Sequence, residues 1–331
     1  MKQYLDILRK ILENGTPKQP VRVGADGVAI AVENGTTTTF CEIFRHDMSK
    51  GFPLLTTKFV SLKTIAVELE FFIKGLTCKQ WLKDRKCNIW NEWANPQAVE
   101  EAIKDCEQRT QNLNYVDARK ELQKILVDLG AAYGFQWRHF DQHYTYESED
   151  WQATFDKAPN GVAKGFDQLK YIADTLRSNP YDRRMVCSAW NMNQKHITSL
   201  PPCHYAWNVV VVGNKLNLVW NQRSVDTKLG LPYNIASYAL LLTLLANHAN
   251  LELGELVGTL HDCHLYDNHL EQAKEQLSRE PKKLPKVEIW NNTYEQECDE
   301  TYLFNIFEWT SNQFNLHGYE HHPAIKAEIT V

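Results

Sequence analysis

The pattern of apolar and polar positions predicts a chain that mixes helices with strands. Residues 1–14 carry apolar side chains at helical spacing, and Gly15 follows where a left-handed cap would end that helix. A second helix is expected from Ser61, a plausible N-cap, to Lys74, with Gly75 as its stop. The other predicted helices cover residues 167–177, 232–250 and about 268–277, the second with Pro232 in its first turn.

Two strand-like segments, residues 205–212 and 215–222, flank Gly213-Asn214, a sequence typical of a two-residue hairpin turn. Because a hairpin folds about its turn, Cys203 and Arg223 are expected at the same end of the paired strands. Further strands are predicted at residues 185–190, 255–263, 287–290 and 302–307. This irregular alternation favours an α+β fold over a regular parallel α/β arrangement.

One stretch, residues 95–129, differs in composition because it is rich in Glu, Gln, Lys and Asn. It contains two weakly amphipathic patterns, at residues 98–106 and 118–129, and it is too short to support a core of its own. We interpret it as a helical insertion on the surface of a single domain that covers residues 1–331. Residues 142–166 are predicted to form a long loop.

Composition and charge exclude several classes of protein. With 43% hydrophobic and 23% charged residues, the chain as a whole is not disordered. A net charge of −5 provides no global basic field, so nucleic-acid binding is not expected. The eight cysteines form no CxxC pair, which suits free thiols in a reducing compartment. Asp6, Arg9 and Lys10 interrupt any signal-like apolar run, so we expect a soluble cytoplasmic protein without a membrane span.

Cys203 is the first candidate for chemistry, because two prolines precede it at the entry to a predicted strand. A thiol is mostly protonated at neutral pH, so a nucleophilic cysteine needs a cation nearby. Arg223 would supply that cation, and together with Ser224 it would also be well suited to bind a phosphate group. The alternative is a small buried cysteine, with arginines in ordinary surface ion pairs.

Other candidates are a carboxylate and two tryptophans. Glu68 lies in an apolar helical segment, where burial would raise its pKa and suit proton transfer near neutrality. The helix dipole alone could equally favour a glutamate there. Trp90 and Trp93 are three residues apart and could form one aromatic face that stacks a flat ligand, although core packing is the commoner use.

Polar side chains further along the chain complete the pattern. The Asn234 amide can read the edge of a base or cap a turn. His264 and Tyr266 lie on one side of an extended segment and could bind a sugar hydroxyl or a metal. No further ligand stands at zinc-like spacing, so no metal is expected. Together these residues indicate a pocket for a phosphorylated planar ligand.

Nine stretches of the sequence resemble the folate-dependent thymidylate synthase family, in the family's order and over the whole chain. They are residues 51–58, 89–93, 133–138, 182–184, 188–191, 201–204, 222–226, 229–238 and 264–266. The resemblance implies reductive methylation of dUMP to dTMP, with 5,10-methylenetetrahydrofolate as donor of the carbon and the hydride. It also implies a large mixed β-sheet packed by helices, with the sheets of two copies back to back in a homodimer.

The resemblance also assigns roles to residues. Cys203 would attack ring carbon 6 of dUMP, and Asn234 would read oxygen 4 and nitrogen 3 of the pyrimidine. The implied catalytic residues are Cys203, Glu68, Tyr133, His204, Asn234 and Asp226. The implied dUMP-binding residues are Arg22, Arg183, Arg184, Arg223, Ser224, Asn234, His264 and Tyr266, with Arg183 and Arg184 crossing from the other subunit. The implied folate-binding residues are Trp90, Trp93, Asp226, Leu229, Gly230, Tyr233 and Val331.

The sequence departs from the family pattern at four places. The stretch after Arg22, residues 23–27, differs from the family's usual Thr- and Gly-rich loop, which leaves the alignment of the phosphate loop open. Phe59 replaces a frequent basic residue, Asn208 a glutamine and His261 a glycine, which leaves substrate and polyglutamate preference open. Two rival functions also remain: a hydroxymethylase acting on dUMP or dCMP, and a non-catalytic nucleotide- or RNA-binding protein. Asn234 favours uracil, because cytosine-specific relatives carry an acidic residue there.

Overall fold

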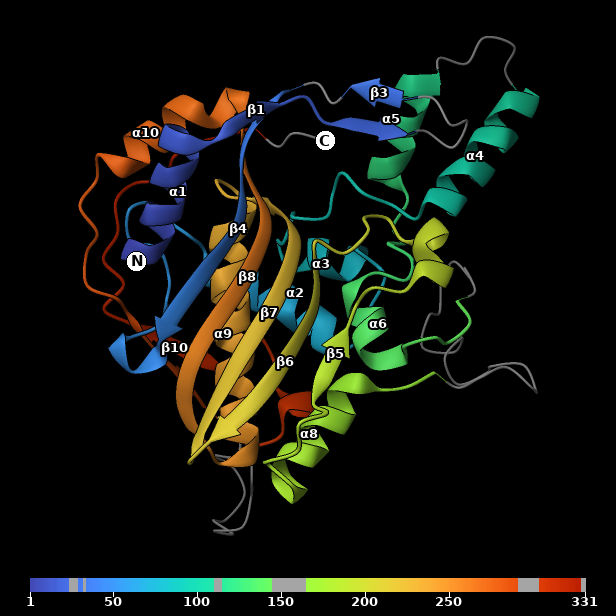
Figure 1. Ribbon diagram of the computed structural model, residues 1–331. Helices are drawn as coiled ribbons and strands as arrows, with labels where there is room; N and C mark the ends of the chain where they lie inside the picture. Colours follow the sequence, from blue (N-terminus) through green and yellow to red (C-terminus); the bar gives the residue numbers. More distant parts are fainter. Residues whose placement is uncertain (24–28, 32–33, 110–114, 145–164, 291–303, 329–331) are drawn as a thin grey trace. The chain divides into compact units, whose positions relative to one another are not determined.

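A computed structural model describes residues 1–23, 29–31, 34–109, 115–144, 165–290 and 304–328 (Figure 1). The chain divides into two compact units. The first comprises Met1–Ala66, Asn179–Arg183 and Cys203–Val331, and the second comprises Val67–Ser178 and Arg184–Pro202. Within the described ranges, no helix is both long and apolar enough to cross a membrane.

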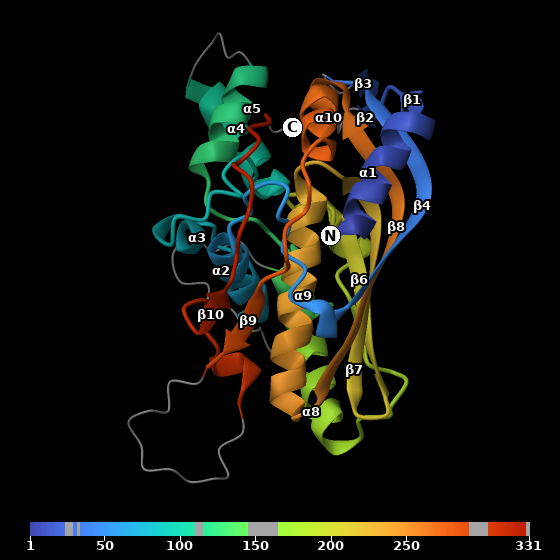
Figure 2. The same cartoon turned by 90° about the vertical axis from the view of Figure 1, so that its left-hand side faces the viewer.

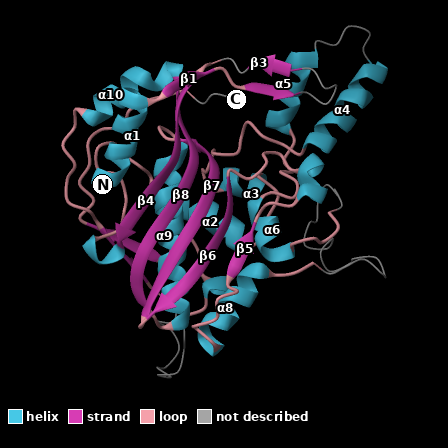
Figure 3. Cartoon of the chain, in the orientation of Figure 1, coloured by secondary structure: helices cyan, strands magenta, loops and turns pink. Residues whose placement is uncertain are grey.

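A large mixed sheet dominates the first unit (Figure 3). Its strands run in the order β1 (Thr16–Lys18), β4 (Thr36–Asp47), β8 (Glu252–Tyr266), β7 (Lys215–Asp226) and β6 (His204–Val212). The β7–β8 pair is parallel and the other pairs are antiparallel. Two small ribbons pair β2 (Val21–Val23) with β3 (Ala29–Ala31), and β9 (Lys286–Ile289) with β10 (Phe314–His317).

Two helices of the first unit, α1 (Lys2–Asn14) and α9 (Gly230–Ala249), lie on the same side of this sheet (Figure 2). Buried and more exposed residues alternate along most of β7 and β8, as the pleat requires, and the alternation shifts after Gln222 in β7 and after Leu260 in β8. Phe44 of β4 and Trp220 of β7 are fully buried, and their rings are 5.8 Å apart. The helix α9 is apolar on nearly all sides, as expected for a helix enclosed by the core. The remaining helical segments of this unit are α10 (Leu270–Leu277) and the short 3₁₀ turns Met48–Lys50, Asp267–His269 and Ile306–Glu308.

The second unit is mainly helical. The helix α2 (Leu62–Ile73) begins in the first unit and continues into the second, where Phe72 packs against Tyr133, Trp90 and Trp137. Gly134 allows α6 (Tyr133–His139) to approach α2, because a Cβ there would lie 2.7 Å from the Phe72 Cα. The other elements are α3 (Gln80–Asp84), α4 (Pro96–Arg109), α5 (Tyr115–Ile125), α8 (Gln168–Ser178), β5 (Val186–Ser188) and the 3₁₀ turn Met192–Ile197.

The predicted α+β fold with a large mixed sheet is confirmed, and three local predictions are wrong. Gly15 is extended (φ −70°) and not left-handed, because the chain passes straight from α1 into β1. The strand predicted at residues 302–307 is replaced at its C-terminal end by the 3₁₀ turn Ile306–Glu308, while residues 302 and 303 lie outside the described ranges. The second inserted helix ends at Ile125, since Asp128 forms a β-bridge with Cys78. Most of the loop predicted at 142–166 also lies outside the described ranges.

Candidate active site

The β6–β7 hairpin brings Cys203 and Arg223 together. The turn forms at Gly213, whose φ of +61° suits glycine, and the register is the predicted one. The Arg223 N–H donates to the Cys203 carbonyl oxygen at 2.8 Å. Cys203 is partly exposed, and the cysteines in the described part of the chain form no disulfide. This backbone bond brings the two residues to the same end of the hairpin, as predicted.

His204, the next residue, is held by α9. Its Nδ1 lies 2.9 Å from the Tyr238 hydroxyl, and the Tyr238 ring stacks on Trp220 at 5.3 Å. Desolvation lowers the pKa of His204 to about 3. The ring is consequently neutral at physiological pH, so it can relay a hydrogen bond but does not serve as a cation.

Asn234 lies near the start of α9, and Gln222 of β7 orients its amide. The Gln222 Nε2 donates to Asn234 Oδ1 at 3.1 Å and to the Ser224 carbonyl at 3.1 Å. The Trp220 Nε1 donates in turn to Gln222 Oε1 at 3.2 Å. This relay fixes which end of the Asn234 amide accepts and which end donates. The sequence placed Gln222 in a motif but gave no signal for its orienting role.

Asp226 ends β7 and caps the turn into α9. Its Oδ1 accepts the backbone N–H groups of Lys228 at 3.0 Å and Leu229 at 2.9 Å. A Cβ at Gly230 would lie 3.6 Å from the Asp226 Cβ and 3.7 Å from Asn234 Oδ1, so Gly230 stands between these two side chains. Tyr233 immediately precedes Asn234 in α9. The predicted folate residues Asp226, Leu229, Gly230 and Tyr233 therefore form one contiguous segment.

A buried polar network, which was not predicted from the sequence, holds the turn between β7 and α9 in place. The fully buried Lys228 donates from Nζ to Gln276 Oε1 at 2.7 Å, and its carbonyl accepts Lys58 Nζ at 2.5 Å. The Tyr4 hydroxyl donates to the Thr227 carbonyl at 3.0 Å. Desolvation lowers the pKa of Lys228 to about 7, helped by the Lys58 charge, and lowers the pKa of Lys58 to about 8. The turn carrying Asp226 is thus fixed by several independent bonds.

His264 and Tyr266 lie at the end of β8, beside the segment described above. Asp226 and His264 are register partners, and the Thr227 N–H donates to the His264 carbonyl at 3.0 Å. The rings of His264 and Tyr266 meet edge to face at 5.3 Å. Both side chains therefore lie on one side of the strand, as predicted.

The second unit contains the predicted proton-transfer group. Glu68 of α2 is buried, and its Oε1 accepts the Trp90 indole N–H at 2.8 Å. Desolvation raises the pKa of Glu68 to about 7, although the Trp90 bond acts in the opposite direction. Trp90 meets Trp93 at 5.9 Å and Tyr133 at 5.8 Å, both edge to face. The structure therefore brings Glu68, Trp90, Trp93 and Tyr133 into one cluster.

The remaining predicted residues stand apart from these clusters. Arg183 and Arg184 are exposed, in the first and second unit respectively. The segment before them is tied to the hairpin turn, since the Tyr181 hydroxyl donates to the Gly213 carbonyl at 3.1 Å. Arg22 occupies β2 opposite Ile30, and Val331 lies outside the described ranges.

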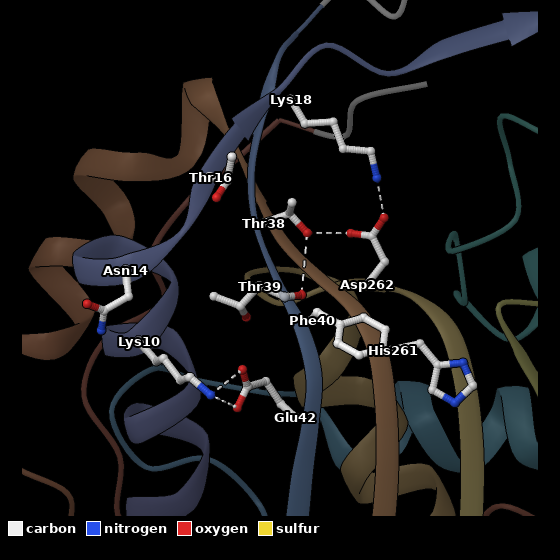
Figure 4. Close-up of a pocket in the computed structure, with 10 residues that line it drawn as sticks. All are labelled: Lys10, Asn14, Thr16, Lys18, Thr38, Thr39, Phe40, Glu42, His261 and Asp262. Carbon is white, nitrogen blue, oxygen red and sulfur yellow. Dashed lines mark hydrogen bonds and ion pairs between the residues drawn. The ribbon is translucent and has the colours of Figure 1, made fainter.

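A cavity of about 530 Å³ beside α1, β1 and β4 contains none of the predicted site residues (Figure 4). Its charges are paired locally, because Lys10 contacts Glu42 at 2.8 Å and Lys18 contacts Asp262. No set of three or more His, Cys, Asp or Glu side chains in the described part of the chain is placed to hold a metal ion.

Comparison with known proteins identifies the family. A sequence model of thymidylate synthase matches residues 2–331. The chain is 39% identical over 333 residues to the thymidylate synthase of Mycoplasma mobile, and 37% identical over 331 residues to that of Mycoplasma pneumoniae. Both matches cover 100% of this chain and 100% of the relative. With matches over its full length, this chain belongs to the thymidylate synthase family.

Proposed function

We propose that this cytoplasmic enzyme methylates dUMP to dTMP through a covalent adduct on Cys203, and that 5,10-methylenetetrahydrofolate is its cosubstrate. The observation that carries the proposal is the strand pairing in which the backbone N–H of Arg223 donates to the Cys203 carbonyl at 2.8 Å, because it brings both residues to the same end of the hairpin. Carbon 6 of uracil is a weak electrophile, so the reaction needs a thiolate. A neighbouring guanidinium favours that form of the sulfur.

The chain's own groups account for binding and activation of the nucleotide. The Cys203 sulfur adds to carbon 6, and the electron pair moves toward carbon 5 and oxygen 4. The Asn234 amide, held by Gln222, meets oxygen 4 and nitrogen 3 of the ring. We assign the phosphate to Arg22, Arg183, Arg184, Arg223 and Ser224, and the 3′-hydroxyl to His264 and Tyr266.

Proton transfer falls to the cluster in the second unit. Glu68 has a pKa of about 7, so protonated and ionised forms are both present at neutral pH. Tyr133 and the neutral His204 complete the proton network. The Trp90–Trp93 pair shields the reacting carbon from water.

The residues assigned to folate fit a flat ring with an N–H edge. Asp226 presents a carboxylate held by two backbone N–H groups, and Gly230 beside it has no side chain. Trp90 and Trp93 supply aromatic surface, and Leu229, Tyr233 and Val331 complete the set. When bound, the folate provides the one-carbon unit and the hydride.

The proposal is tested by mixing the purified protein with dUMP and 5,10-methylenetetrahydrofolate and following absorbance. A synthase releases dihydrofolate, so absorbance rises while dTMP accumulates. A hydroxymethylase would return tetrahydrofolate, and a nucleotide-binding protein would convert nothing. Absence of both products from folded protein would refute the proposal.

The amide orientation at Asn234 yields a prediction about base choice. An Asn234→Asp variant should lose roughly 100-fold in kcat/KM for dUMP, because an acceptor then faces oxygen 4 and leaves it without a donor. Activity on dCMP should rise, since cytosine presents a donor at position 4. Steady-state assays with both nucleotides measure the change. Equal activity on dUMP and dCMP in the wild-type enzyme would contradict this assignment.

We further propose a homodimer formed through the sheet face that points away from α1 and α9. In the first unit this face exposes four large apolar side chains from β4 and β6: Phe40, Ile43, Val210 and Val212. Phe40 is 86% exposed and also lines the cavity in Figure 4. Apolar groups gathered on one face mark a surface suited to association. The exposed Arg183 and Arg184 would then serve the partner's phosphate site.

A Val210→Asp variant should therefore be monomeric, because a carboxylate in a dry interface is unfavourable. Its activity should fall at least about tenfold, since the partner's arginines are lost. Light scattering after size exclusion gives the mass. The matched control is Ile125→Asp, which changes an exposed apolar residue on α5 and should stay dimeric. A fully active monomer would contradict the proposal.

A further inference from the structure

Lys79, at the start of α3, is a fully buried lysine in the second unit. Its Nζ donates to three backbone carbonyls: Asn91 at 3.0 Å, Trp93 at 2.7 Å and Gln123 at 2.6 Å. An ammonium has three donor hydrogens, and here each has an acceptor. Burial of a charge is unfavourable unless hydrogen bonds compensate it, and these three carbonyls compensate the burial of the Lys79 ammonium.

Two of the three carbonyls belong to the tryptophan turn, defined here as residues 88–95. The turn is closed by backbone bonds from Asn91 N–H to Asn88 and from Trp93 N–H to Trp90, each 3.2 Å. Both bonds are internal to the turn, so they do not fix its orientation relative to the neighbouring elements. Lys79 supplies two such contacts, to Asn91 and Trp93.

The third carbonyl belongs to α5, one of the two inserted helices. The two helices contact each other through a small apolar cluster, in which Val99 and Ile103 of α4 pack with Leu122 and Leu126. Glu100 also pairs with Arg119 across the two helices.

The base of the insertion is closed at two points beside the tryptophan turn. Asn95 donates from Nδ2 to Asp128 Oδ2 and from its backbone N–H to the Asp128 carbonyl, both at 2.8 Å. The inserted helices are therefore anchored next to the tryptophan turn, and one ammonium bonds both.

We propose that Lys79 is a positioning residue for the reaction, which couples the inserted helices to the tryptophan turn so that Trp90 keeps its hydrogen bond to Glu68. The inserted helices are then a supporting part of the active site and not a surface decoration. This inference rests on the roles assigned above to Trp90, Trp93 and Glu68.

The test replaces Lys79 with methionine, which fills a similar volume without donors. Lys79→Met should raise KM for the folate about tenfold, the effect of losing one or two net hydrogen bonds. Its kcat profile should move to higher pH, because the Trp90 N–H bond that holds the pKa of Glu68 down is weakened. Affinity for dUMP alone, measured by calorimetry, should not change.

The matched control is Lys83→Met. Lys83 lies one turn along α3 and donates to the Lys124 carbonyl of α5 at 3.2 Å, so it tests loss of a lysine bond to the inserted helices alone. This variant should keep the wild-type KM and pH profile. Far-UV circular dichroism of each variant verifies that it is folded.

A second variant covers the case in which Lys79→Met does not fold. Ile103→Ala loosens the apolar cluster between the inserted helices away from the tryptophan turn, and should raise KM for folate in the same direction by a smaller factor. Folded variants with wild-type KM and pH profile would overturn the inference. A wild-type enzyme that forms no dihydrofolate would instead overturn the proposed function, so the two failures are distinguishable.

Discussion

Replacing Cys203 with alanine is expected to lower kcat by at least about 10⁴-fold, the scale on which loss of a nucleophile acts. dUMP should still bind, because its phosphate, base and sugar contacts come from other side chains. The dihydrofolate assay measures turnover, and calorimetry measures binding of dUMP. We expect turnover to be lost while dUMP binding is kept, because the sulfur forms the covalent bond and does not contribute to recognition of the nucleotide.

Covalent trapping provides the decisive measurement for Cys203. With 5-fluoro-dUMP and 5,10-methylenetetrahydrofolate, the wild-type enzyme should gain an adduct on the peptide that contains Cys203. The adduct persists because fluorine at carbon 5 cannot leave as a proton does. The control Cys106→Ala, which changes a partly exposed cysteine on α4, should trap fully. An adduct on the Cys203→Ala protein would refute the assignment.

Glu68→Gln is expected to reduce kcat on the order of 10³-fold, within the range for loss of a general acid–base group. Glutamine keeps an oxygen that can accept the Trp90 N–H but cannot carry the proton. In the wild-type enzyme kcat should change with pH around 7, the pKa of Glu68, and this dependence should vanish in the variant. The control Glu70→Gln changes a buried carboxylate of the same helix that pairs with Lys74 at 2.7 Å. It should retain the pH dependence.

The same Glu68→Gln variant should be more stable than wild type at alkaline pH. Folding raises the pKa of Glu68 from 4.5 to about 7, so the native state binds its proton more tightly than the unfolded chain does. The contribution of Glu68 to the free energy of unfolding of the wild-type protein is present below pH 4.5 and is lost as the pH rises to 7. The loss is about 3.5 kcal/mol above that pH, at ~1.4 kcal/mol per pKa unit. Thermal unfolding at pH 4 and pH 8 measures it, and an equal Tm difference at both values would contradict it.

Features encoded within a few residues could be predicted from the sequence. The Gly213-Asn214 turn fixes the register of β6 and β7, and that register alone places Arg223 beside Cys203. The N-cap at Ser61 is likewise local, and its Oγ accepts the Thr64 N–H at 3.2 Å. Both predictions are confirmed because neighbouring residues determine them.

Features that depend on distant partners could not be predicted. The strand β4 was missed, since it pairs with β8, where Thr36 meets Tyr266. The burial of Lys58, Lys79 and Lys228 could not be predicted either, because only the folded chain supplies the carbonyls that accept their hydrogen bonds. Residue type is visible in a sequence, whereas the acceptors that make a buried charge tolerable are not.

The network below Asp226 restricts how this part of the enzyme can evolve. Lys228 donates from Nζ to Gln276 Oε1 at 2.7 Å and to the Gln272 carbonyl at 3.1 Å, so an apolar residue at this position would remove the donor from two buried acceptors. A single substitution at position 228 is therefore deleterious even when the new residue packs well. Relatives of this protein that lack Lys228 should also have a different residue at position 276. These two positions should therefore covary.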